Sequence, residues 1–129
     1  MKHLLLTTIA AVVLVGCGPS ETDRALLDAA ENGNIKAVEQ AIVDGAEVDA
    51  KDSDGWTPLH NAANGGYMEV AKLLIAKGVD VNAKVNDGRT PLDWAKDVEN
   101  LQRSKTKVAK KETADLLLKH GGKTGEELK

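Results

Sequence analysis

Aromatic residues are nearly absent from this chain. It has no phenylalanine, and two tryptophans and one tyrosine make up the 2% aromatic share of its 129 residues. A core of stacked large rings is therefore excluded. The apolar side chains, 42% of the sequence, must instead pack by close approach of small residues, among which alanine recurs.

Cysteine and histidine, which most often bind metals or act as nucleophile and base, are also scarce. Cys17 is the only cysteine, so no disulfide can form within the chain. Only His60 and His120 follow it, no serine lies in a nucleophile motif, and Gly122-Lys123-Thr124 lacks the preceding glycine of a phosphate loop. We therefore expect no enzymatic activity, no metal site and no cofactor.

One long apolar run stands at the start of the chain. Leu4–Val15 contains twelve residues with only two threonines and follows the basic Lys2. Its length suits the core of a signal peptide and falls short of the ~20 residues needed to span a bilayer. An ordinary secretory signal that happens to contain a cysteine is one interpretation of this segment.

The end of the apolar run favours a second interpretation. Leu14-Val15-Gly16-Cys17 resembles a bacterial lipobox, in which the cysteine receives diacylglycerol before cleavage on its amino side. The resemblance implies a lipoprotein signal peptide at 1–16, lipidation of Cys17 and a linker at 17–21. Gly18 replaces the aspartate that retains many such proteins at the inner membrane. We therefore expect an outer-membrane anchor facing the periplasm, if the host has an outer membrane.

The rest of the chain repeats with a period of 33 residues. Asp54–Asn86 is one copy, and Asp87–Lys96 opens the next. An earlier copy, Glu21–Ser53, lies one period before the first of these. A fixed period of this size predicts stacked supersecondary units, none of which can bury its apolar face alone.

Within the middle copy, local signals predict two antiparallel helices and a loop. Thr57 is a good N-cap and Pro58 suits a first helical turn. Gly65-Gly66 ends this helix, and Gly78 ends a second one that carries Leu73 and Leu74 on its apolar face. The sequence therefore predicts helix, reversal, helix and protruding loop in each copy. We expect Leu59, Leu73 and Leu74 at the centre of the stack.

Thr57-Pro58-Leu59-His60 and Gly78–Ala83 resemble the ankyrin repeat. The first copy has Arg24–Leu27 in place of that motif, and Asp93 replaces its histidine in the third copy, which leaves the turn hydrogen bonds there open. The resemblance implies an all-α ankyrin-repeat solenoid and a structural role for His60. It implies no particular activity. The implied domain covers 22–124, divided into copies at 21–53, 54–86 and 87–124, and a tail at 125–129 follows.

The third copy is interrupted by an insertion. Glu112–Leu118 matches Glu69–Ile75 at a step of 43 residues, so ten residues have been added near 98–107. Val98 and Leu101 continue the apolar spacing of the preceding helix, which predicts that this helix runs to about Leu101.

The insertion leads into a basic stretch, Arg103–Lys111, with five cations and no acid. It is either a solvated loop or helix end, or a contact for lipid headgroups or an acidic partner. No aromatic residue lies in it, so binding of nucleic acid by base stacking is not expected.

Charge is unevenly spread over the chain, whose formal net charge is −3. Glu21–Asp54 contains ten acids and three bases, whereas Lys96–Lys123 contains eight bases and four acids. This asymmetry either steers a charged partner or a head-to-tail copy, or belongs to the polar outer faces that terminal repeats need. Both interpretations stay open.

The resemblance also implies a binding surface on the loop tips and the inner face of the first helices. The matching positions are Lys51, Ser53, Asp54, Trp56, Asn64 and Gly65 in the middle copy, Lys84, Asn86, Asp87, Arg89 and Asp97 in the third, and Asp23, Glu31 and Asn32 in the first. Trp56 is either an interface hot spot or a packing residue. Trp94 is expected to pack.

These observations favour a non-catalytic protein-binding module, anchored by lipid on Cys17 in a bacterial cell envelope. We expect a monomer whose partner is another protein, with no nucleic acid bound. The alternative is a structural envelope lipoprotein that contacts lipid or cell-wall polymer through the basic insertion.

Overall fold

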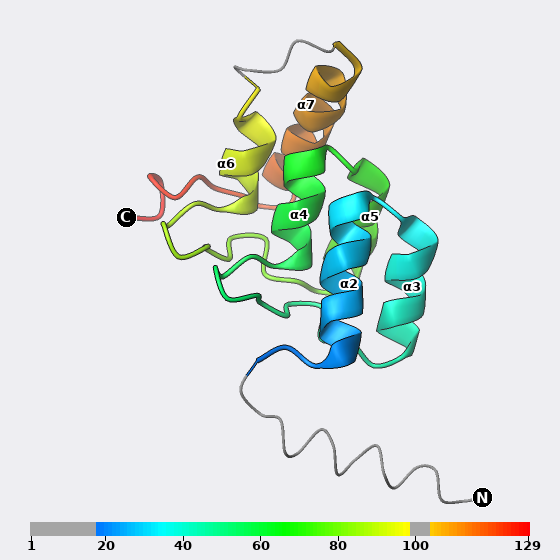
Figure 1. The fold of residues 1–129 in the computed structure, drawn as a ribbon. Coiled ribbons are helices and arrows are strands. Elements are labelled where there is room, and N and C mark those ends of the chain that lie inside the picture. The colour runs from blue at the N-terminus through cyan, green and yellow to red at the C-terminus, as the bar shows by residue number, and fades with distance from the viewer. Residues whose placement is uncertain (1–17, 99–103) are drawn as a thin grey trace, which may run out of the picture.

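The chain forms a stack of three helical hairpins (Figure 1). The computed structural model describes residues 18–98 and 104–129. Its helices are α2 (Glu21–Asn32), α3 (Ile35–Val43), α4 (Pro58–Gly65), α5 (Met68–Ala76), α6 (Pro91–Lys96) and α7 (Ser104–Lys119). Neither described range contains a strand. The predicted all-α solenoid of three units is therefore confirmed.

The helix ends follow the capping signals in the sequence. The Thr57 hydroxyl accepts a hydrogen bond from the His60 backbone N–H at 3.3 Å, and Gly66 closes α4 in the left-handed region, with φ 72°. In the first copy, Ser20 and Asp23 form a capping box one turn earlier than the matching position. Helix α2 therefore begins at Glu21, and the described part of the expected linker is limited to 18–20.

The core is built from equivalent positions of the three repeats. On the first helices, Leu26, Leu59 and Leu92 are 0%, 0% and 1% exposed. On the second helices, Leu74 and Leu117 are fully buried. Leu73 was expected beside them but lies at the edge of the core, partly exposed, because it points to the side that carries exposed Gln40 in the first repeat. The prediction was right for Leu59 and Leu74 and wrong for Leu73.

The turns between paired helices are as closely packed as the core. The ring of Tyr67 lies against both Gly33 and Gly65, and a methyl group at either position would collide with it. Gly65 was predicted on the binding surface, but its space is taken up by this ring. The single tyrosine therefore packs neighbouring helical hairpins together at the points where their helices reverse.

The protruding loops are joined by a ladder of polar contacts. At the same position of each repeat, a backbone N–H donates to a side-chain oxygen. These bonds are Glu47 N to Asp23 Oδ1 at 2.8 Å, Asp80 N to Asp49 Oδ1 at 3.1 Å, and Lys123 N to Asn82 Oδ1 at 2.7 Å. In addition, Asn86 donates to the carbonyls of Ser53 and Asp54, at 3.1 and 2.9 Å. The bond to Asp23 ties the loop of the first repeat to the start of α2 in the same repeat, and the other bonds hold loops of successive repeats side by side.

The insertion lengthens α7 and not α6. Helix α7 has 16 residues where α5 has nine, whereas α6 ends at Lys96. The prediction that this helix continues to Leu101 is wrong, since Asp97 already leaves the helix with ψ 87°. Leu101 itself lies outside the described residues. The Asp97 carbonyl oxygen accepts a 2.8 Å hydrogen bond from Lys110 Nζ, which fixes the end of α6 against α7.

Lys110 of the basic stretch is neither solvated nor available to a ligand, as the two interpretations of this stretch had required, because it is buried. Its side chain is 4% exposed, and burial lowers its pKa, against the opposing effect of the Asp97 carboxylate. An ammonium group is costly to bury, so its bond to the Asp97 carbonyl is needed to offset part of that cost. One of the five cations is therefore a structural residue, while Lys105, Lys107 and Lys111 are exposed.

Candidate binding surface

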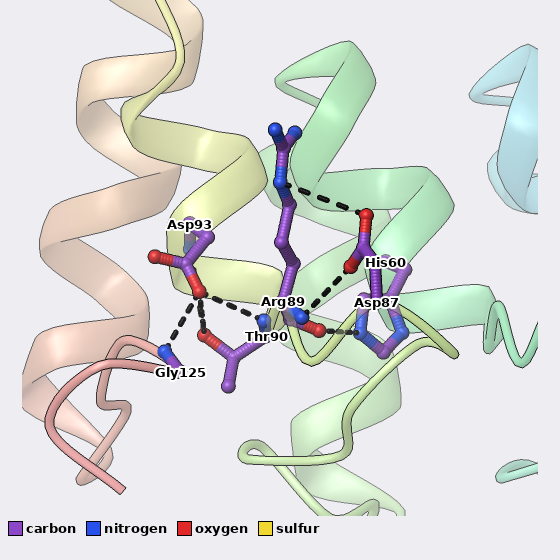
Figure 2. Close-up of polar contacts among 6 residues, drawn as sticks. All are labelled: His60, Asp87, Arg89, Thr90, Asp93 and Gly125. Carbon is purple, nitrogen blue, oxygen red and sulfur yellow. Dashed lines mark hydrogen bonds and ion pairs between the residues drawn. The ribbon is translucent and has the colours of Figure 1, made fainter. Parts of the chain in front are cut away.

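The loop between α5 and α6, 77–90, presents Arg89 at the surface (Figure 2). Its carbonyl accepts from the Val85 backbone N–H at 2.9 Å, and its own N–H donates to Asp87 Oδ1 at 3.0 Å. Its Nε lies 3.8 Å from Asp87 Oδ2, although both side chains are about half exposed. The guanidinium is thus held at the surface with donors facing solvent.

Arg89 belongs to a cluster with both tryptophans. The ring centroids of Trp56 and Trp94 are 4.6 Å apart at an interplanar angle of 42°. The Arg89 guanidinium lies 4.6 Å from the centroid of the Trp94 ring, within cation–π range. We call Trp56, Trp94 and Arg89 the Trp–Arg cluster. Trp94 packs against the core as expected, but its contact with Trp56 was not predicted.

Trp94 also carries an unusual polar group. Its indole Nε1 is buried and has no hydrogen-bond partner among the described residues. The matching residue of the middle repeat, Asn61, donates from its side chain to the carbonyl of Leu27 at 3.2 Å. Tryptophan at this position therefore gives up an inter-repeat hydrogen bond and extends the aromatic surface around Trp56.

His60 has the structural role that the sequence implied. Its Nδ1 accepts from the Thr57 backbone N–H at 3.2 Å, so the ring proton lies on Nε2, which donates to the Arg89 carbonyl at 3.3 Å. Burial is the main reason that its pKa falls to about 4, against the opposing effect of the Arg89 and Ala83 carbonyls. A buried, neutral imidazole that fastens one loop to the next is not available as a catalytic base.

Asp93 replaces this histidine and makes the turn hydrogen bonds in a different way. Its Oδ2 accepts from the Thr90 backbone N–H at 3.0 Å and lies 3.2 Å from the Thr90 hydroxyl oxygen, whose proton is used in a shorter bond to the Lys123 carbonyl. The same carboxylate oxygen accepts a second bond, 2.8 Å long, from the backbone N–H of Gly125 (Figure 2). The turn left open by the sequence is therefore formed, with the C-terminal segment as an additional partner.

One open hollow lies beside the Trp–Arg cluster, and another lies between the first two repeats. The first, about 480 Å³, brings together the predicted residues Lys84, Asp87, Arg89 and Asp97. The second, about 340 Å³, includes Glu31 and Ser53. Lys51, Asp54, Asn64 and Asn86 are exposed but line neither hollow, and Trp56 is partly buried.

Several lining residues were not predicted. Gly125, Glu126 and Lys129 of the C-terminal segment form a wall of the larger hollow, and Arg24 and Asp28 line the smaller one. Gly125, Glu126 and Lys129 were not predicted because the ten-residue insertion breaks the 33-residue period before them. The period therefore could not align the C-terminal segment with the loops of the earlier repeats. The aspartate at the histidine position was the one sequence signal that something different follows the third repeat.

Two kinds of feature are absent from the described residues. Residues 18–98 and 104–129 contain no group of three or more potential ligands placed to hold a metal ion. Among the helices in those ranges, none is both long and apolar enough to cross a bilayer. Cys17, the predicted lipidation site, lies outside the described residues.

Comparisons with known proteins agree with the repeat architecture. The family model described as ankyrin repeats (3 copies) matches residues 26–126. A curated human protein, the mitochondrial disaggregase, is 43% identical over 54 residues, which cover 40% of this chain. The match spans 8% of the length of that relative, so the similarity concerns a small part of it.

Proposed function

Because the chain belongs to the ankyrin-repeat family, we propose that it is a protein-binding module held at a bacterial cell envelope by lipid on Cys17. Members of this family are generally non-catalytic interaction modules. The observation that carries the proposal is the Trp–Arg cluster, an aromatic surface with a fixed cation beside an open hollow. Tryptophan and arginine are the residues most enriched in interface hot spots.

The Trp–Arg cluster is preorganised for binding. Arg89 is held by its contact with Asp87 and by the Trp94 ring, and its carbonyl is held by His60. A side chain that is already ordered loses little conformational entropy when it is buried in an interface. The guanidinium nevertheless keeps solvent-facing donors, which suit a carboxylate on the partner protein.

We expect Trp56→Ala to weaken partner binding by more than about 1 kcal/mol, because a central aromatic side chain excludes water from the interface. Arg89→Ala should come next. The measurement is quantitative capture of proteins from solubilised envelope, with circular dichroism to confirm that each variant stays folded. The control is Lys105→Ala with Lys107→Ala on α7, which should leave capture nearly unchanged. The reverse ranking would favour the alternative function.

The position of the basic stretch argues against contact with lipid, which is one form of the alternative. The backbone of Lys110 packs on Gly66, at the C-terminal end of α4, whereas Ser20 caps the opposite end of the neighbouring α2. In Figure 1, α2 starts at the bottom of the view and α7 starts at the top. Helix α2 has 12 residues and is therefore about 18 Å long. This is roughly the distance along the helix axis between Ser20 and the level at which Lys110 packs.

An anchor at Cys17 would therefore keep the basic stretch away from lipid. Only Gly18 and Pro19 separate that cysteine from Ser20, a reach of roughly 10 Å. The acidic first turn of α2, with Glu21 and Asp23, would then face the bilayer. Lys105 and Lys107 would then point into the aqueous compartment, away from lipid headgroups.

Substitution of the cysteine tests the anchor separately from the binding surface. We expect Cys17→Ser to release the protein from membranes or to leave its precursor uncleaved, because diacylglycerol has no thiol to join. Membrane fractionation and the mass of the mature chain report both results. The control, Gly18→Asp, should keep the protein lipidated and move it to the inner membrane. A processed Cys17→Ser protein that still sediments with membranes would disprove the anchor.

A further inference from the structure

The segment that follows α7 folds back over the loop between α5 and α6. Asn82 donates from its side chain to the Gly121 carbonyl at 3.1 Å, and the Thr90 hydroxyl donates to the Lys123 carbonyl at 2.5 Å. Gly125 lies so close to Gly88 that a methyl group on Gly125 would collide with the Gly88 carbonyl oxygen. The segment is therefore packed against the loop along its length.

A short helical turn then begins at Gly125. The Thr124 backbone N–H donates to Glu127 Oε1 at 2.9 Å, and the Glu127 N–H donates to the Thr124 hydroxyl at 3.2 Å. This is a capping box, and its bond from the Thr124 N–H lowers the pKa of Glu127. The first N–H groups of such a turn lack internal acceptors, so the Gly125 N–H needs one from elsewhere.

Asp93 supplies this acceptor, and the middle repeat shows why histidine could not. In the middle repeat, His60 Nδ1 accepts one bond, from the Thr57 N–H. In the third repeat, Asp93 Oδ2 accepts from both the Thr90 N–H and the Gly125 N–H. A carboxylate oxygen has two lone pairs and can accept both bonds, whereas an imidazole nitrogen has only one lone pair. Aspartate can therefore close its own turn and bind the C-terminal segment with the same oxygen.

We propose that Asp93 is a positioning residue that docks the C-terminal segment, 121–129, over the loop between α5 and α6. The docked segment then forms one wall of the hollow that contains Arg89. The docking itself is independent of the proposed function, while the use of that hollow by a partner rests on it. Failure of the docking test would leave the Trp56 prediction standing, so the two hypotheses fail separately.

Residue-specific hydrogen exchange of the full chain in detergent tests the docking. In the wild-type protein, the Gly125 amide should be protected. Asp93→Ala should speed its exchange at least tenfold, since the amide loses its acceptor. Asp93→Asn retains a carbonyl oxygen and should restore protection, whereas Asp93→His should not. The matched control is Asp97→Asn, a neighbouring aspartate in the same hollow, which should leave the exchange rate of the Gly125 amide unchanged.

The Val85 amide, bonded to the Arg89 carbonyl, distinguishes release of the segment from unfolding. It should stay protected in every variant. If Asp93→Ala exposes Val85 as well, Gly125→Ala decides, because its methyl group should displace the segment while Asp93 is intact. Unchanged exchange at residue 125 in both Asp93→Ala and Gly125→Ala, or an unprotected Gly125 in the wild-type protein, would overturn the proposal.

Discussion

Replacing Leu74 with alanine should lower the free energy of unfolding by about 2–5 kcal/mol. Leu74 is 0% exposed, and its helix α5 lies between α3 and α7 in the stack. Truncation would remove buried methyl groups and leave a cavity that neighbouring repeats, held by their own contacts, can fill only in part. A small domain has roughly 5–15 kcal/mol of stability in total, so the loss is a large fraction of it.

Leu73 provides a matched control for this experiment. It is the same residue type on the same helix, one position away, but it lies partly exposed at the edge of the core. Leu73→Ala should therefore cost markedly less than Leu74→Ala when both are measured by urea denaturation followed by circular dichroism. Equal losses at the two positions would mean that the two repeats flanking α5 do not enclose Leu74 as the structure shows.

The contrast between these two leucines shows how far burial could be predicted from the repeat period. Leu73 and Leu74 have the same local signal, since both fall on the apolar side of a short helix. What separates them is the neighbouring repeat, where exposed Gln40 matches Leu73 and buried Ala41 matches Leu74. The three-unit fold and its helix caps could be predicted because they depend on residues close together in the sequence or on exact repetition.

The features that could not be predicted join residues that the period does not relate. Helix α6 ends at Lys96, and the next carbonyl, that of Asp97, accepts from Lys110, beyond the insertion. The Trp56–Trp94 contact joins a loop residue to a helix residue of the next repeat, and these occupy different positions of the motif. Each depends on the precise packing of two elements, which no local pattern reports.

The binding surface falls between these cases. The resemblance implied Arg89 as a surface residue, and the structure adds its ring contact with Trp94 and its ion pair with Asp87. The wall formed by the C-terminal segment could not be predicted, because the position of Gly125 depends on the carboxylate of Asp93. Polar contacts of this kind are chosen by donor and acceptor geometry in three dimensions, and composition carries little information about them.

Acidification should destabilise the protein through His60. Burial lowers the pKa of this imidazole from 6.5 to about 4, so below pH 6.5 the unfolded state takes up a proton more readily than the folded state. The contribution of the neutral ring is fully present above pH 6.5 and is lost as the pH falls towards 4. The two pKa values differ by an amount that corresponds to about 3 kcal/mol. The free energy of unfolding, measured by urea denaturation across this range, should fall accordingly.

His60→Gln separates this effect from other acid titrations. The glutamine amide can still donate to the Arg89 carbonyl but takes up no proton, so the variant should lose the decline between pH 6.5 and 4. His120→Gln, at an exposed histidine, should keep the wild-type profile. Asp23 contributes in a different window: although burial raises its pKa, the N–H groups of Glu47 and Ser20 lower it below 3.8, so its contribution is lost only at lower pH. An unchanged decline in His60→Gln would show that the imidazole joining the second and third repeats is not the group that acid disrupts.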